Sequence, residues 1–168
     1  ANTLLLNVLD LLFSFPMPII LALLLNEIRV KWFKRVTQTL LYLPHFLSWV
    51  VIGATAYAMF ATNSGVINTL IANAGKSPIP FLQEDAWWLF SYILIGIWQT
   101  MGWGTIIYLA AIAGVSPALY ESAAIDGANR WDMLVHITLP RILPSVAVMF
   151  ILSVAPLFMA NFDQVYNL

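Results

Sequence analysis

Residues 86–113 read AWWLFSYILIGIWQTMGWGTIIYLAAIA and contain no charged side chain. A helix needs about 20 mainly apolar residues to cross the hydrocarbon core of a bilayer. Backbone amides and carbonyls find no water there, so a crossing segment must satisfy them internally, as a helix does. This stretch therefore predicts a membrane-spanning helix and decides the fold class.

The rest of the chain has the same character. Of its 168 residues, 61% are hydrophobic and 9% are charged, whereas soluble domains contain about 25% charged residues. Hydropathy predicts four crossings, at about 4–25, 39–61, 86–113 and 142–160. We therefore expect an all-α, polytopic transmembrane helical bundle in a cell membrane.

The basic residues predict how this bundle is oriented. Four of them follow the first span and two follow the third, whereas the connection after the second span holds only Lys76. Cytoplasmic loops collect Lys and Arg, so we expect loops 26–38 and 114–141 to face the cytoplasm and loop 62–85 to face outward. The chain begins without Met and stops just beyond a span. We expect it to be a piece of a longer membrane protein.

Composition also excludes several classes of function. A formal net charge of −1 offers no basic footprint for nucleic acid. The absence of cysteine removes disulfides, thiolate metal sites and cysteine nucleophiles. The histidines, His45 and His136, lie in no HExxH pattern and near no acidic cluster at the spacing of a metal or catalytic site. We therefore expect no catalytic residue and no metal site.

Polar and aromatic groups in the spans are candidates for a solute pathway. Asp10 lies within the first span, where a charge is costly. It is either a pathway residue or a group hydrogen-bonded to a neighbouring helix. Aromatic faces stack on sugar rings, and a polar run ends the fourth span, which gives the candidates Tyr57, Trp98, Tyr108, Asn161, Phe162 and Asp163. Core packing or an interfacial position is the alternative for each.

Loop 114–141 is the most informative connection. Ser116 and Pro117 predict a helix start, because a serine hydroxyl can cap free amides and proline suits the first helical position. Gly127 predicts the end of that helix, and Asn129 can cap a second one, which Pro140 should terminate. On the first helix, one face is formed by small residues and a tyrosine: Tyr120, Ala123, Ala124 and Gly127. Such a face lets another protein approach closely.

The spacing in this loop resembles the EAA signature of binding-protein-dependent ABC importer permeases. That signature is E-A-A, three residues, G, nine residues and I-x-L-P. The loop supplies every position in register, with serine in place of the first alanine: Glu121, Ser122, Ala123, Gly127, Ile137, Leu139 and Pro140. Softer matches, such as ALLLNE at 22–27 and WQTMGW at 98–103, resemble the sugar and oligosaccharide branch of this superfamily.

This resemblance implies a type I ABC importer permease, with residues 1–168 as an incomplete transmembrane domain. It implies that the loop is a coupling helix that docks on a cytoplasmic ABC ATPase subunit, which would bind ATP and Mg²⁺, so this chain needs no cofactor. The docking role falls on Glu121, Ser122, Ala123, Ala124 and Gly127, with Asp126 adding charge for a basic partner and Ile137, Leu139 and Pro140 in support. The other implied partners are a second permease subunit, usually a paralogue, an extracytoplasmic solute-binding protein and the lipid bilayer.

Two other functions stay open at this point. A secondary transporter would show charged relays or matched broken helices in inverted repeats, and Asp10 is the one acid well inside a predicted span. An importer permease for a solute other than a sugar would carry the same EAA loop. The sequence does not identify the solute.

Overall fold

The computed structural model describes residues 2–158 and 162–168. Every regular element in these ranges is helical, and no strand occurs among them, so the all-α prediction is confirmed. In chain order the elements are α1 (Asn2–Ser14), α2 (Pro16–Glu27), α3 (Lys31–Tyr42), the 3₁₀ turn η1 (Leu43–Phe46), α4 (Trp49–Phe60), α5 (Val66–Asn73), α6 (Asp85–Ala113), α7 (Pro117–Ile125), α8 (Arg130–Met133), the π-helical turn η2 (Leu134–Thr138), α9 (Leu139–Val154), the 3₁₀ turn η3 (Ala155–Phe158) and α10 (Phe162–Asn167).

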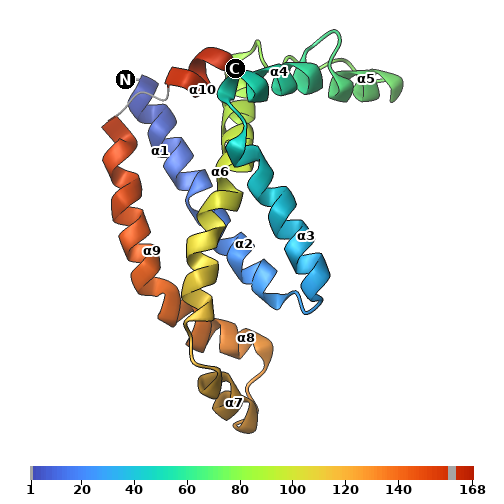
Figure 1. The fold of residues 1–168 in the computed structure, drawn as a ribbon. Helices are drawn as coiled ribbons and strands as arrows, with labels where there is room; N and C mark the ends of the chain where they lie inside the picture. Colours follow the sequence, from blue (N-terminus) through green and yellow to red (C-terminus); the bar gives the residue numbers. More distant parts are fainter. Residues whose placement is uncertain (1, 159–161) are drawn as a thin grey trace.

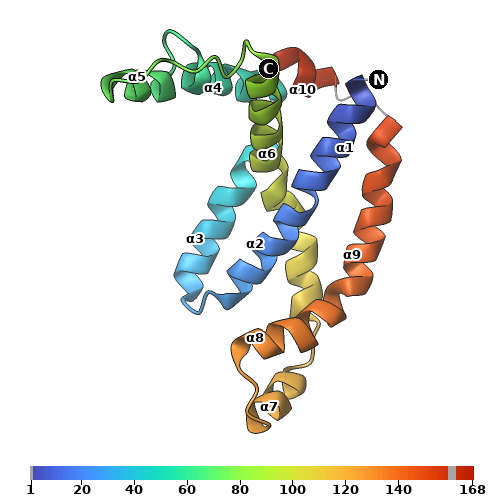
Figure 2. The same cartoon turned by 180° about the vertical axis from the view of Figure 1, so that it is seen from behind.

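Helix α6 is the centre of the bundle, with α3 and α9 on opposite sides of it and α1 and α2 running beside it (Figure 1; Figure 2 shows the view from behind). One buried cluster joins α2, α6 and α9 through Ala22, Tyr108, Ile112 and Ile142. Three continuous helical stretches of the described residues are long and apolar enough to cross a membrane: Thr3–Glu27, Asp85–Ala113 and Arg130–Leu157. They contain the segments expected at 4–25 and 86–113 and most of the one expected at 142–160.

The expected crossing at 39–61 is wrong as a single helix. Helix α3 continues into η1, and the chain then bends by 107° into α4. Pro44 has no amide hydrogen, and its ring displaces the carbonyl one turn earlier. Leu47 is extended, with ψ of 139°, and Ser48 restarts the helix by accepting a 3.5 Å hydrogen bond from the Val51 amide. Together these residues redirect the chain sideways (Figure 1).

The prediction that Pro140 terminates a short helix is also wrong. The helix is continuous from Arg130 to Leu157 because η2 widens one turn just before the proline. In that turn the Leu139 amide donates to the carbonyl of Leu134, five residues back. Pro140 then falls in the first turn of α9, where a missing amide hydrogen is tolerated. Loop 114–141 is therefore joined to α9 without a break.

Glycine in α6 serves helix packing, as expected for small residues between membrane helices. A Cβ atom at Gly102 would overlap the carbonyl oxygen of Leu41, where α3 crosses α6. Any side chain at this position would push the two helices apart. The close contact fixes how far α3 is shifted along the axis of α6.

Residues 49–80, called the lateral arm below, comprise α4, α5 and the turns around them and extend to one side of the bundle end (Figure 1). Asn68 is buried at the centre of the arm. Its amide donates to the carbonyls of Ala61 (3.2 Å) and Ile79 (2.8 Å), and its Oδ1 accepts from the Ile79 amide (2.7 Å). Asn68 therefore ties the turn after α4 to the segment at Ile79 and folds the lateral arm back on itself.

Candidate functional site

Helix α7 begins at Pro117 and is followed by Gly127, as the sequence predicts. Gly127 has φ of +83°, a backbone conformation that residues other than glycine rarely adopt. Its amide donates to Ala124 O (3.2 Å), and the Ala128 amide donates to Ala123 O (2.9 Å), which closes the helix end. The expected cap at Ser116 is absent, because its hydroxyl makes no capping hydrogen bond. Proline and glycine therefore set the bounds of α7.

The inner side of α7 is tethered to the helix that follows it. The phenol oxygen of Tyr120 lies 3.0 Å from Oγ1 of Thr138, which is buried in η2. Tyr120 and Ala123 are half-buried against the molecule. Tyr120 therefore attaches α7 to the helix that follows it, and the docking role assigned to Ala123 stays a prediction.

The start of α8 is closed by a reciprocal cap. Oδ1 of Asn129 accepts from the amides of Trp131 (2.8 Å) and Asp132 (3.1 Å), and Oδ2 of Asp132 accepts from the Asn129 amide (3.0 Å). Arg130 reaches Glu27 at the end of α2 across 3.4 Å. Both side chains of this ion pair are about half exposed, so it contributes little stability. It does connect the loop to the first span.

The outer surface of the loop combines charge with two large apolar side chains. Glu121, Ser122, Ala124, Asp126 and Gly127 are exposed, as their assigned docking role requires. Of the supporting residues, Ile137 and Leu139 are half-buried and Pro140 is exposed. The sequence analysis missed the most exposed apolar groups, Ile125 at 87% and Trp131 at 70%. Their position among polar neighbours was the signal that could have found them.

Figure 1 shows α7 beyond the end of α6, outside the helical bundle. The exposed Ile125 at the end of α7 and Trp131 in α8 are unfavourable in water unless another surface covers them. We call the exposed residues Glu121, Ser122, Ala124, Ile125, Asp126 and Trp131 the loop tip. The tip has the form of a protein-docking surface.

A polar cavity of about 390 Å³ lies beside the middle of α6, well away from the loop tip. Four helices contribute to it, and its lining is Asp10, Trp49, Gln99, Thr100, Phe162, Asp163 and Gln164. Gln164 is held in place because its Nε2 donates to the carbonyl of Tyr92 (3.0 Å). Gln99 differs from it: the residue is only 8% exposed, and its amide makes no hydrogen bond to another described residue but opens onto the cavity. An amide that opens onto a polar cavity can hydrogen-bond water or a ligand there.

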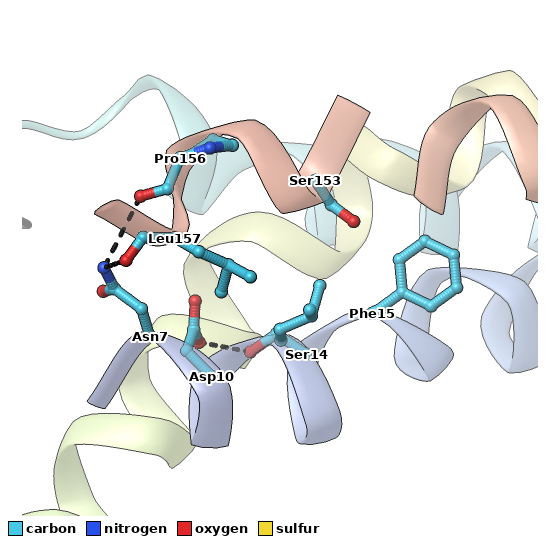
Figure 3. A pocket seen from close by; sticks show the side chains of 8 residues that line it. Asn7, Asp10, Ser14, Phe15, Ser153, Pro156 and Leu157 are labelled. Atoms are coloured by element: carbon cyan, nitrogen blue, oxygen red, sulfur yellow. Dashed lines mark hydrogen bonds between the residues drawn. The ribbon is translucent and has the colours of Figure 1, made fainter. Parts of the chain in front are cut away.

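Asp10 lines this cavity and also a neighbouring one of about 270 Å³ between α1 and the end of α9. In Figure 3, Oδ1 of Asp10 accepts a 2.5 Å hydrogen bond from the hydroxyl of Ser14, and the amide of Asn7 donates to the carbonyls of Leu157 (2.8 Å) and Pro156 (3.5 Å). The carboxylate is therefore partly satisfied within its own helix. It still borders both cavities.

The predicted pathway residues do not form one group. Phe162 and Asp163 line the polar cavity. Tyr108 lies in the core cluster, Trp98 lines a separate apolar cavity beside α4, and Tyr57 is exposed on α4 outside the polar cavity. Asn161 is outside the described residues. The sequence analysis did not identify Gln99 as a candidate, because a single glutamine within an apolar helix gives no motif.

Comparison with known proteins places this geometry in a family. Residues 3–162 match the family model described as binding-protein-dependent transport system inner membrane component. The chain is 47% identical over 167 residues to the polygalacturonan/rhamnogalacturonan transport system permease protein YteP of Bacillus subtilis (strain 168), covering 99% of this chain and 52% of that protein. It is 45% identical to Protein LplB of the same organism, covering 98% and 52%.

The same similarity holds in three dimensions. A solved bacterial ABC transporter involved in the import of the acidic polysaccharide alginate superposes with a TM-score of 0.95 at 41% identity, covering 99% of this chain and 58% of that one. The chain thus spans about half the length of the curated relatives it matches. These matches confirm the predicted relationship, and the chain belongs to the family of inner membrane components of binding-protein-dependent transport systems.

Proposed function

We propose that this chain forms part of the membrane-spanning permease of an ATP-driven importer for sugars or oligosaccharides. One relative named above is a polygalacturonan/rhamnogalacturonan transport system permease protein, and the solved structure belongs to an importer of the polysaccharide alginate, which supports a saccharide as the solute. The observation that carries the proposal is the loop tip, an exposed apolar and acidic surface on a helix tethered to the bundle.

In this proposal the loop tip docks on a cytoplasmic ATPase subunit, which supplies the ATP and Mg²⁺ chemistry. Movement of the docked α7 passes through the Tyr120–Thr138 contact into the continuous helix Arg130–Leu157, and through Arg130 and Glu27 into the first span. ATP shifts the equilibrium between access states only if those states bind it differently. The chain itself contributes a lever and has no part in hydrolysis.

The polar cavity is the part of the solute pathway that this chain contributes. The amide of Gln99 can donate to and accept from sugar hydroxyls, and the indole of Trp49 offers a face for a sugar ring. A second permease subunit would complete the cavity. The lateral arm lies at the opposite end from the loop tip and would meet the extracytoplasmic solute-binding protein.

The test is reconstitution of the full permease pair and its ATPase in proteoliposomes with the solute-binding protein. We expect the permease to copurify with the ATPase, and the loaded binding protein to stimulate ATP hydrolysis and oligosaccharide uptake together. Uptake should survive dissipation of ion gradients. Uptake that follows an ion gradient without ATP would overturn the proposal and indicate a secondary transporter.

A further inference from the structure

The corner between α2 and α3 carries a concentrated positive charge. Residues 28–35, called the basic corner below, contain Arg29, Lys31, Lys34 and Arg35. None of these four makes an ion pair within the part of the chain that the structure describes. The nearest acid, Glu27, is bonded to Arg130 instead. The basic corner therefore has cationic groups available to an anionic partner.

The basic corner lies at the level where the membrane spans end. Helices α3 and α6 run in opposite directions (Figures 1 and 2), and Leu41 meets α6 at Gly102. Lys31 lies ten residues before Leu41 on α3, and Ile112 lies ten residues after Gly102 on α6. Each is therefore about 15 Å from the crossing, on the same side of it. Helix α6 ends at Ala113. The charges of the corner are thus next to the boundary between hydrocarbon and water.

Apolar side chains alternate with these charges. Trp32 is 72% exposed, and Val30 and Phe33 are also exposed. An indole ring prefers the headgroup level of a bilayer, and a basic amphipathic segment lies at that level with its apolar groups directed toward the acyl chains. The position of the corner next to the ends of the membrane spans favours a lipid headgroup as the anionic partner over an acidic protein surface. A phospholipid supplies both a phosphate and a hydrocarbon environment.

We propose that the basic corner is a binding site for the headgroups of anionic phospholipids. Lys and Arg side chains hold the phosphates, and Trp32 and Phe33 lie among the headgroups and upper acyl chains. The bound lipids fix the end of α2, where Glu27 contacts the loop that carries α7. The proposal requires that the chain is embedded in a bilayer but does not depend on its transporting any solute.

The experiment compares lipid selectivity of the full transporter in bilayers of phosphatidylcholine mixed with phosphatidylglycerol. Spin-labelled phosphatidylglycerol and spin-labelled phosphatidylcholine report which lipid is immobilised at the protein surface. The test variant combines Lys31→Gln, Lys34→Gln and Arg35→Gln, and Lys76→Gln on the lateral arm is the control for loss of charge alone. Assembly of each variant is checked by copurification with the ATPase.

We expect the wild-type protein to prefer phosphatidylglycerol, and each charge lost from the basic corner to weaken that preference about fivefold. High salt should weaken it in the wild-type protein, and Lys76→Gln should leave it intact. Replacing the two lysines by arginine should preserve it. The proposal is overturned if the wild-type protein shows no preference, if the triple variant keeps it, or if the triple variant loses the ATPase while its lipid preference stays unchanged.

Discussion

Loop 114–141 and the polar cavity differ in whether their polar side chains are hydrogen-bonded within the protein. In the loop, Asn129 and Asp132 cap each other, the helix end at Gly127 is closed, and Tyr120 bonds to Thr138. In the cavity, the amide of Gln99 makes no hydrogen bond to another described residue and opens onto the cavity space. The loop uses polar side chains to hold its own turns and exposes apolar surface, whereas the cavity leaves a polar amide open to a solute.

This difference separates two physical requirements. A region that transmits motion must not rearrange under load, so its own hydrogen bonds should be complete. A region that binds a polar solute must keep donors and acceptors free for it, and water can bond to them until the solute arrives. The polar cavity borders the middle of α6 and the loop follows its C-terminal end, so variants can test each region without altering the other.

Ile125→Asp should give the largest effect. Burying an isoleucine in a partner surface contributes about 2 kcal/mol, and a carboxylate in the same contact adds a desolvation cost. We expect retention of the ATPase on the purified permease to fall at least about thirtyfold, with loss of binding-protein-stimulated ATP hydrolysis. Ile125→Leu keeps the apolar contact and should retain the ATPase. Equal copurification of Ile125→Asp and wild type would show that the loop tip does not dock.

Gly127→Val should have the next largest effect, and the chain offers a matched control in Gly75. Both glycines have positive φ, +83° and +75°, and neither has a neighbour that a Cβ would meet. A side chain at either position costs about 1–2 kcal/mol of local strain. Gly127→Val should unwind the end of α7 and lower coupled transport about tenfold. Gly75→Val should carry a similar strain in the lateral arm and leave ATPase copurification at the wild-type level.

If both glycine variants impaired ATPase binding equally, strain anywhere in the chain would explain the loss. The coupling role of α7 would then lack support. Differential scanning calorimetry of each purified variant checks that the two strains are comparable. The two variants can be compared only if they are destabilised equally, because a less stable variant would be expressed less and would retain less ATPase for that reason alone.

Gln99→Leu should act on solute binding and leave folding intact. Loss of a hydrogen bond to a sugar hydroxyl should raise the KM for uptake about fivefold. The same change breaks no hydrogen bond to another described residue, so the melting temperature should stay close to the wild-type value. Gln164→Leu is the control, because it removes the bond to Tyr92 O and should lower the melting temperature. A fall in stability for Gln99→Leu would mean that its amide is structural.

Sequence patterns sufficed where a local rule decides the structure. The charge-free run at 86–113 predicts α6, and Pro117 and Gly127 predict the bounds of α7. Asn129 caps α8 as expected. In each case the residues that determine the helix or its ends are close together in the sequence, so the sequence alone predicts the local structure.

Sequence patterns were misleading where the structure depends on contacts between distant segments. Pro44 and Pro140 look alike as helix breakers, yet one is followed by a sharp bend and the other is accommodated by the wide turn η2. Tyr108 and Gln99 lie in the same apolar helix, and only its rotation decides that the tyrosine packs in the core while the glutamine lines the cavity. Helix rotation is set by tertiary contacts such as the Gly102–Leu41 crossing.

Tyr120→Phe should give the smallest effect, and it tests directly whether motion of α7 reaches the bundle through the Tyr120–Thr138 contact. It removes one hydroxyl, and Thr138 keeps a second acceptor, the carbonyl of Met133 at 3.4 Å. No buried group is orphaned, so the loss should be about 0.5 kcal/mol. The loop tip remains intact and the ATPase should bind as in wild type, but solute uptake per ATP hydrolysed should fall. Tyr166→Phe on α10 is the control, because that phenol is exposed. An unchanged ratio of uptake to hydrolysis in Tyr120→Phe would mean that motion of α7 reaches the bundle by another route, of which the backbone of α8 and η2 is the most direct.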